Sequence, residues 1–137
     1  MPCIVSYRKV IDALTTRELR RPLDPATGQP LGQEIAEIDG VTYYVLPDGA
    51  ELPAEQPEDI APKRVTLTPA LREALRAACP HVAIINVRVR EAIAERYGTT
   101  DEIKLLRTAP SAEFKVYNAY VEECRAWGRA EKAKLGL

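Results

Sequence analysis

The residue types that most often do chemistry are sparse in this chain of 137 residues. It contains three cysteines, Cys3, Cys79 and Cys124, and a single histidine, His81. A zinc site would have to bring all four together, because structural zinc takes four such ligands. The odd number and wide spacing of the cysteines also differ from the disulfide framework of a small secreted protein. We therefore expect no metal centre and no disulfide network, and we predict no cofactor.

Cys79 and His81 flank Pro80 and suggest a thiolate–imidazole pair of the kind that cysteine enzymes use. Residues two positions apart on a helix point in different directions, and no third group is evident that would orient the imidazole. A small buried cysteine beside a histidine at a helix start is the favoured alternative. The chain also lacks a phosphate-binding glycine loop and the Gly-x-Ser-x-Gly and His-Glu-x-x-His motifs. We therefore predict that the protein is not an enzyme.

Charge is uneven along the chain although the totals nearly cancel. Nineteen Lys and Arg against twenty Asp and Glu give a formal net charge of −1, which predicts neither a nucleic-acid nor a membrane partner. Residues 24–62 contain nine acidic residues and no Lys or Arg, whereas residues 68–137 have a small basic excess. The apolar runs are too short for a membrane span, and the N-terminal segment lacks the layout of a secretory signal peptide.

The first half of the chain is predicted to contain a β-hairpin. Residues 33–38 and 41–46 are β-prone and flank Asp39-Gly40, a sequence that favours a type I′ turn. A two-residue loop would set these cross-strand pairs: Ile38 with Val41, Ala36 with Tyr43, and Glu34 with Val45. Both faces of such a hairpin are apolar, and an isolated hairpin is marginal in water. We therefore expect a third strand or a partner chain, and residues 3–10 are suited to a strand.

The second half is predicted to be helical. Thr68 with Pro69 and Ser111 are typical helix starts, and Gly98 is a typical stop. The expected helices are 69–79, a segment that starts or kinks at Pro80 and ends before Gly98, a short one over 103–107 after a capping-box pattern at 99–102, and a long one over 112–134. The expected fold class is α+β, with a small antiparallel sheet followed by three or four helices.

The acidic stretch 51–62, which contains three prolines, is typical of an extended linker. We place a boundary there, between an acidic, Pro- and Gly-rich hairpin and arm region (1–62) and a helical region (63–137). A single compact domain with an arm is the alternative.

Two surface features of the helical region invite a functional interpretation. Tyr120 and Trp127 form a stripe on the long helix, which is either an aromatic patch for a partner or part of one wide buried face. The C-terminal basic cluster comprises Arg125, Arg129, Lys132 and Lys134. Glutamates interrupt this cluster, and a solvated face is favoured over phosphate contacts. A DNA-binding helix-turn-helix across 68–97 is the weaker alternative, because Glu91 and Glu95 lie among its arginines.

Several segments of the sequence resemble small uncharacterised proteins from the tail-gene clusters of proteobacterial bacteriophages and prophages. The resemblance is carried by residues 80–86, 96–97, 101–108 and 117–129, and more loosely by 38–41, 46–49 and 52–53. It includes no motif with known chemistry. It implies a virion component of the tail, fibre or baseplate, found in the virion tail or in the host cytoplasm during assembly, with other tail or fibre proteins as partners and a homo-oligomeric state.

The functional prediction is a non-enzymatic structural or assembly protein that acts through protein–protein contacts. A tail assembly chaperone that leaves the virion and a small helical DNA-binding regulator are the alternatives. The predicted contact residues lie on the hairpin and on the long helix: Val41, Tyr43, Tyr44, Val45, Tyr117, Tyr120 and Trp127.

Overall fold

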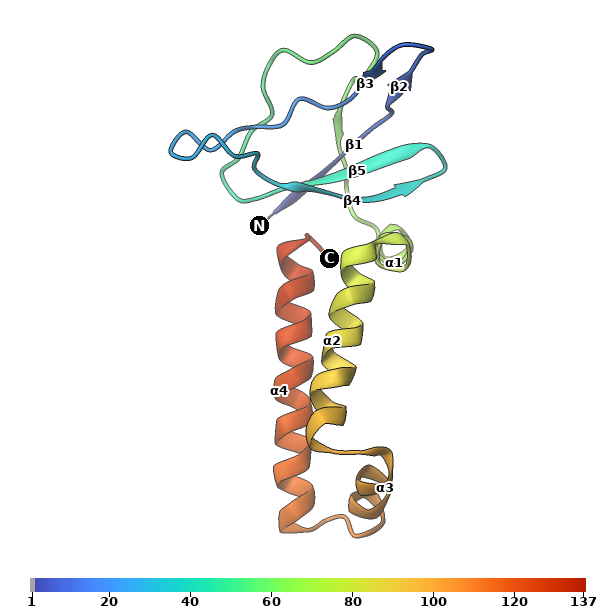
Figure 1. Ribbon diagram of the computed structural model, residues 1–137, viewed down its shortest axis with the longest axis vertical. Helices are drawn as coiled ribbons and strands as arrows, with labels where there is room; N and C mark the ends of the chain where they lie inside the picture. Colours follow the sequence, from blue (N-terminus) through green and yellow to red (C-terminus); the bar gives the residue numbers. More distant parts are fainter. Residues whose placement is uncertain (1) are drawn as a thin grey trace. The chain divides into compact units, whose positions relative to one another are not determined.

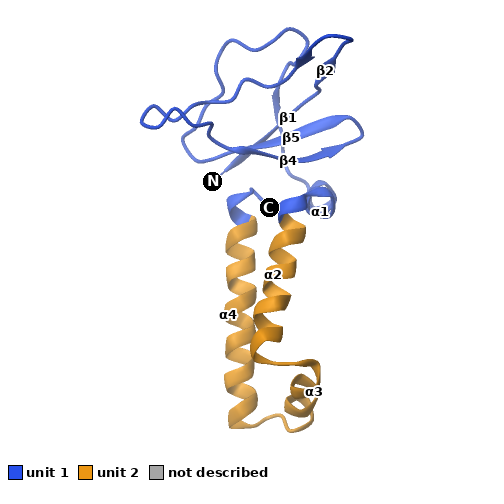
Figure 2. Ribbon diagram, in the orientation of Figure 1, with its two compact units in different colours: residues 1–81, 133–137 blue, residues 82–132 orange. Residues whose placement is uncertain are grey.

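The computed structural model describes residues 2–137, which form two compact units (Figure 2). Unit 1 comprises the residues up to 81 together with 133–137, and unit 2 comprises residues 82–132. This division lies later in the chain than the boundary that we placed at residue 62. The acidic stretch belongs to unit 1, because Ile60 is buried in that unit's core and Lys63–Arg64 form its last strand. The secondary structure is mixed α+β, as predicted.

Unit 1 contains a four-stranded antiparallel sheet (Figure 1). Its strands follow the order β4 (Gln33–Ile38), β5 (Val41–Leu46), β1 (Cys3–Tyr7) and β6 (Lys63–Arg64). β1 is the third strand that the hairpin was expected to need, and it pairs with β5 along its whole length. Asp39 and Gly40 have φ angles of 51° and 78°, and a type I′ turn requires positive values at both positions.

The register of the hairpin follows the prediction near the turn and departs from it farther away. Ile38 lies opposite Val41, and Ala36 lies opposite Tyr43, as predicted. The predicted pairing of Glu34 with Val45 is wrong, because a register shift between Glu34 and Ala36 places Glu34 opposite Tyr44. The extra residue on β4 is a bulge, which a strict alternation of side chains cannot anticipate.

Tyr44 lies at the centre of the core of unit 1 and has no exposed surface. Its hydroxyl donates a hydrogen bond of 2.5 Å to the carbonyl oxygen of Leu31. Gly32 has a φ of 77°, and a Cβ there would collide with the carbonyl oxygen of Val45 and would lie 2.7 Å from the ring of Tyr44. Glycine is therefore required where the chain approaches β5. The buried residues of this cluster are Val5, Tyr7, Leu19, Tyr44, Leu46 and Ile60.

A second ladder in unit 1, which the sequence did not predict, joins β2 (Val10–Ile11) and β3 (Thr16–Arg17). The Asp12 carboxylate accepts hydrogen bonds from the backbone N–H groups of Leu14, at 3.0 Å, and Thr15, at 2.8 Å. These bonds lower the pKa of Asp12, because they stabilise its charged form. The turn is therefore well defined although the Leu14 side chain at its tip is 94% exposed.

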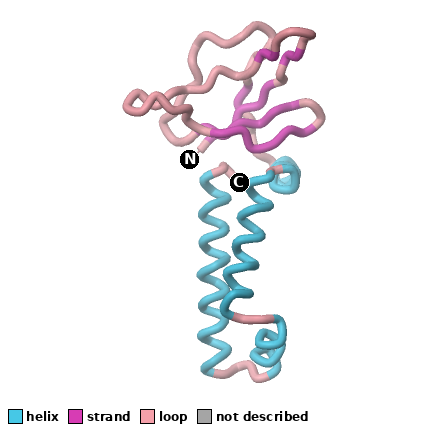
Figure 3. Tube along the Cα trace, in the orientation of Figure 1, coloured by secondary structure: helices cyan, strands magenta, loops and turns pink. Residues whose placement is uncertain are grey.

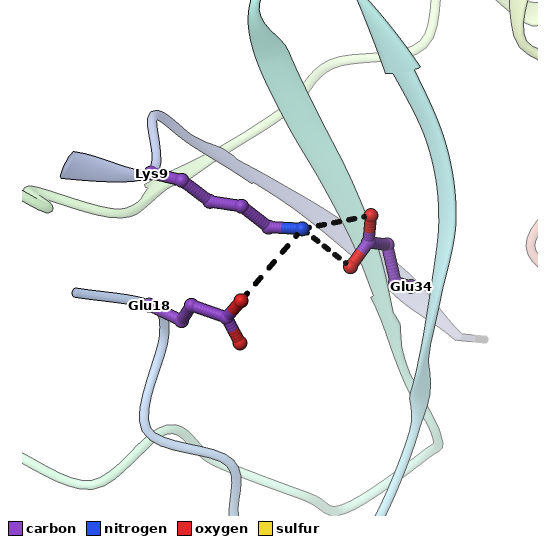
Figure 4. A network of polar contacts seen from close by, with 3 residues as sticks. All are labelled: Lys9, Glu18 and Glu34. Atoms are coloured by element: carbon purple, nitrogen blue, oxygen red, sulfur yellow. Dashed lines mark hydrogen bonds and ion pairs between the residues drawn. The ribbon is translucent and has the colours of Figure 1, made fainter. Parts of the chain in front are cut away.

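Lys9, which precedes β2, connects this part of the chain to β4 (Figure 4). Its ammonium group lies 3.2 Å from the Glu34 carboxylate and 4.0 Å from that of Glu18. The Lys9 side chain is less than a quarter exposed. The pair holds the Glu34 side chain beside the bulge in β4.

Helix α1 (Pro69–Ala78) completes unit 1 and packs against β4. It begins as predicted, since the Thr68 hydroxyl accepts a hydrogen bond of 3.1 Å from the N–H of Leu71. α2 (Pro80–Arg96) begins at Pro80, which decides between the two alternatives left open for that residue.

Unit 2 contains most of α2 and most of α4 (Ala112–Lys134), which lie side by side, with α3 (Thr99–Arg107) between them in sequence (Figure 3). The bounds of α4 are those predicted, and the Ser111 hydroxyl accepts a hydrogen bond from the N–H of Phe114. α3 starts four residues before the predicted 103. Gly98, with a φ of −73°, serves as its N-cap rather than as a left-handed stop, and its N–H donates to the Asp101 carboxylate at 3.1 Å.

Candidate interaction site

The predicted contact residues of the hairpin differ in how far they are available to a partner. Tyr44 and Val45 are buried in the core of unit 1, so their side chains already stabilise the chain itself. Val41 and Tyr43 keep part of their surface exposed. A contact through the hairpin would therefore use these two side chains.

The predicted contact residues of α4 also differ. Tyr117 is buried, meets the ring of Tyr97 edge-on at 4.9 Å and donates a hydrogen bond of 3.0 Å to the Glu102 carboxylate. Burial raises the pKa of the Tyr117 hydroxyl, and the hydrogen bond to Glu102 raises it further. Tyr117 therefore serves to join α4 to α3 and to the end of α2.

Tyr120 and Trp127 retain exposed surface on α4. The Tyr120 hydroxyl donates a hydrogen bond of 2.7 Å to the carbonyl oxygen of Ala92, and the Arg96 guanidinium lies 4.6 Å from the centre of its ring. Trp127 is 42% exposed. The stripe was interpreted either as part of a buried face or as an exposed aromatic patch. Tyr120 is partly buried against α2, whereas Trp127 remains available for a partner.

The cysteines and the histidine are not assembled into a site. Cys79 is buried at the end of α1, whereas His81 is exposed on the first turn of α2. No hydrogen bond joins the two side chains in the part of the chain that the structure describes. Among the same residues there is no group of three or more His, Cys, Asp or Glu that could hold a metal ion.

A groove of about 660 Å³ runs between α2 and α4 of unit 2. Its apolar lining, which we call the floor, includes Val87, Val89 and Gly128. Its cationic lining residues come from both helices. The lining residues are Ala83, Asn86, Val87, Val89, Arg90, Arg125, Gly128, Arg129 and Lys132. None of them is acidic, so the groove presents apolar surface surrounded by positive charge.

Gly128 explains why the groove forms at this level of the two helices. It is buried, and a Cβ at this position would lie only 2.8 Å from Cγ2 of Val89 on α2. The absence of a side chain lets the two backbones approach, and it leaves a depression between the flanking side chains. A glycine inside a helix lowers helix stability by about 1 kcal/mol relative to alanine, so its presence there indicates close packing. Gly128 therefore carried a signal in the sequence that our predictions did not use.

The groove adds a feature that the sequence did not predict. Arg125 and Arg129 are exposed and Lys132 is partly exposed, in keeping with a solvated face, and together with Arg90 of α2 they line a concave surface. Arg90 and the C-terminal cluster lie more than thirty positions apart in the sequence, and only the pairing of α2 with α4 brings them together.

Unit 2 also exposes apolar side chains outside the groove. α2 carries apolar residues around its whole circumference, but in residues 82–132 only Val82, Ile85, Tyr117, Val121 and Gly128 are buried. The large apolar side chains that remain exposed in this unit are Ile84, Val87, Ile103, Leu106, Val116 and Trp127. A further depression of about 320 Å³ includes Ile84 and Val87 and borders the groove through Ala83 and Val87.

Comparison with known proteins found no family that matches the chain, and no curated protein or solved structure that is significantly similar to it. In the described residues no helix combines the length and the apolar character that are needed to cross a lipid bilayer.

Proposed function

We propose that this protein is a structural or assembly component of a bacteriophage tail region and that it works through protein–protein contacts rather than through catalysis. The observation that carries the proposal is the apolar surface that unit 2 leaves uncovered on α2, α3 and α4. Ile84 and Val87 lie together in one depression of α2, and exposed apolar side chains that form a contiguous surface gain stability when they are buried against a partner. A partner that covers Ile84 and Val87 would provide that burial.

The context of the proposal comes from the sequence resemblance to tail-gene-cluster proteins. The segments that carry it include residues 80–86 of α2, which contain Ile84, and residues 117–129 of α4, which contain Trp127. The resemblance and the exposed apolar surface therefore involve the same two helices. A protein whose role is to hold a neighbouring subunit is expected to keep such a surface free until assembly.

The experiment is reconstitution with the proteins of the neighbouring tail genes, each co-expressed with this chain and tested for a complex of defined mass. A stable complex with one of them, together with defective tails after deletion of the gene, is the expected result. Mass spectrometry of purified virions then distinguishes a retained component from a chaperone that leaves. Normal tails after deletion, with no complex with any neighbour, would contradict the proposal.

A substitution experiment tests the surface itself. Ile84→Ser with Val87→Ser is expected to weaken the complex at least tenfold while leaving the thermal unfolding midpoint nearly unchanged, because both side chains are already about half exposed. Ala126→Ser on the exposed side of α4 is the control and should leave the complex intact. An unchanged complex in the double variant would show that the partner binds elsewhere.

A further inference from the structure

Most of the cations that line the groove of unit 2 have no acidic partner within the described residues. Arg125 forms an ion pair with Glu122 at 3.1 Å, but Arg90, Arg129 and Lys132 form neither a hydrogen bond nor an ion pair within the described part of the chain. All three line the groove, where their like charges add to one another. An anionic occupant with some apolar surface would neutralise this charge and cover the floor.

Unit 1 presents a surface of the opposite character. Residues 51–59 contain four carboxylates and no cation. The side chains of Glu55 and Glu58 are each 92% exposed, and that of Asp59 is 75% exposed. We call this surface the acidic ridge and define it by Glu51, Glu55, Glu58 and Asp59.

The acidic ridge is held in place by its non-acidic residues. The Gln56 amide accepts a hydrogen bond of 2.9 Å from the backbone N–H of Arg20, and it donates to the carbonyl oxygens of Arg20 and Pro53 at 3.2 and 3.0 Å. Ile60 is buried in the core and Leu52 packs against it. Because these residues fix the backbone, the ridge loses little conformational entropy when it docks.

The ion pairs that the ridge makes within unit 1 are weak enough to be exchanged. Glu55 lies 3.6 Å from Arg20, and Glu58 and Asp59 lie 3.9 and 3.7 Å from Arg17. Exposed pairs of this kind contribute little to stability. Contact with several cations around an apolar floor would exclude water and strengthen each pair.

We propose that the groove between α2 and α4 binds the acidic ridge of a second copy of this chain. The contact joins two different surfaces, so it can occur twice in a reciprocal dimer or repeat from copy to copy into a closed ring or an open array. The inference rests on the proposed function, because it names one partner of a tail-region component. Charge complementarity selects the occupant: a ridge with four carboxylates against a groove lined by four cations and no acid.

Nucleic acid is the other polyanion that four cations attract, and the structure favours it less. A phosphate backbone would leave the floor formed by Val87, Val89 and Gly128 without an apolar partner. The ridge carries Ala54 and Pro57 among its carboxylates and can cover that floor. DNA binding in the groove would therefore overturn the proposal.

The first measurement is the native mass of the full chain by light scattering after size exclusion, at about 10 and 100 µM protein and at about 50 and 500 mM NaCl. Over this salt range the Debye length falls from about 14 to about 4 Å. We expect a mass above the 15.2 kDa of one chain at low salt, with at least a tenfold weaker association at high salt. A monomer under all four conditions overturns the proposal.

Charge exchange identifies the two surfaces. The groove variant R90E/R129E and the ridge variant E55K/E58K should each be monomeric, and an equimolar mixture of the two should associate again. The matched control K104E/K115E reverses two exposed cations of unit 2 outside the groove and should associate like the parent chain. Circular dichroism checks that every variant is folded. Failure of the mixture to associate, or dissociation of the control, contradicts the proposal.

Two further outcomes separate this inference from the function on which it rests. Binding of a random 20-base-pair duplex that is lost in R90E/R129E, with no self-association, overturns the proposal in favour of nucleic acid. A monomer that still forms a complex with a neighbouring tail protein overturns the ridge contact and leaves the proposed function standing. A salt-sensitive oligomer that passes the charge-exchange test but binds no tail protein supports the ridge contact and counts against the function.

Discussion

Replacement of Gly128 by alanine tests the close approach of α2 and α4. Helix propensity alone predicts that the change stabilises the protein by about 1 kcal/mol, because Gly128 lies inside a 23-residue helix. Packing predicts the opposite. The added Cβ would lie 2.8 Å from Cγ2 of Val89 and 3.8 Å from Cγ2 of Ile85, and carbon atoms in contact normally lie about 3.5–4.0 Å apart.

The clash is the larger effect because Val89 cannot move away easily. Valine in a helix has one strongly preferred rotamer, so relief of the clash requires a shift of α2 against α4. Overpacking of this kind costs about 1–3 kcal/mol. After subtraction of the gain in helix propensity, we expect a net destabilisation of about 1 kcal/mol and a fall in the unfolding midpoint of about 3–6 °C.

A double-mutant cycle measured by urea unfolding isolates the contact. Val89→Ala removes Cγ2, so it should cost less in the Gly128→Ala background than in the parent chain, with a coupling of at least about 0.5 kcal/mol. Ala126→Gly, at an exposed position of the same helix, calibrates helix propensity and should destabilise by about 1 kcal/mol. Stabilisation by Gly128→Ala, with no coupling to Val89→Ala, would refute the reasoning.

Three further predictions concern unit 1. Gly32→Ala should lower the free energy of unfolding in urea by more than about 2 kcal/mol, because the new Cβ would clash with the Val45 carbonyl and the backbone φ at this position is positive. Gly28→Ala is the control: its φ of 72° is similar but the space around it is open, so it should cost about 1 kcal/mol. Equal effects of the two substitutions would contradict the steric argument. Thr68→Ala should cost about 1 kcal/mol through loss of the α1 cap, and Thr66→Ala, outside the helix, should be nearly neutral in the same assay. Burial raises the pKa of Tyr7 to about 12, helped by the nearby Glu34 carboxylate. In the unfolded chain the Tyr7 hydroxyl ionises near pH 10. Between pH 10 and 12 the folded state therefore holds the Tyr7 proton more tightly than the unfolded state does, and the free energy of unfolding falls as the pH rises, by up to about 2 kcal/mol. Tyr7→Phe should show a shallower loss over this range, and an unchanged slope would contradict the assignment.

Local sequence signals determined most of the elements of this protein. The Asp39-Gly40 turn needs positive φ at two adjacent positions, and few other residue pairs adopt that geometry readily, so the hairpin follows from neighbouring residues alone. The starts of α1 and α4 follow from Thr68 and Ser111, because a hydroxyl that accepts an N–H bond acts within three residues. The α+β class is the sum of such local signals.

The tertiary structure decided what depends on contacts between distant residues. The bulge in β4 lies where Glu34 is held by Lys9, twenty-five positions earlier, and no local pattern contains that information. The same holds for β6, whose two residues carry no strand signal of their own, and for the burial of Tyr44 and Tyr117. Hydrophobic patterning indicates which side chains are favoured in a buried position. Only the packing of the other elements determines whether a side chain is buried within the chain or at an interface.

The groove between α2 and α4 shows the same division most clearly. The sequence contains the cations, the acidic stretch and the glycine, and their types alone indicate positive charge, negative charge and close packing. Whether Arg90 and Arg129 form one concave surface depends on the register in which α2 meets α4, and that register is set where Gly128 meets Val89. Charge is a property of single residues and can be read from the sequence, whereas a groove is a property of two surfaces in contact and exists only in the folded chain.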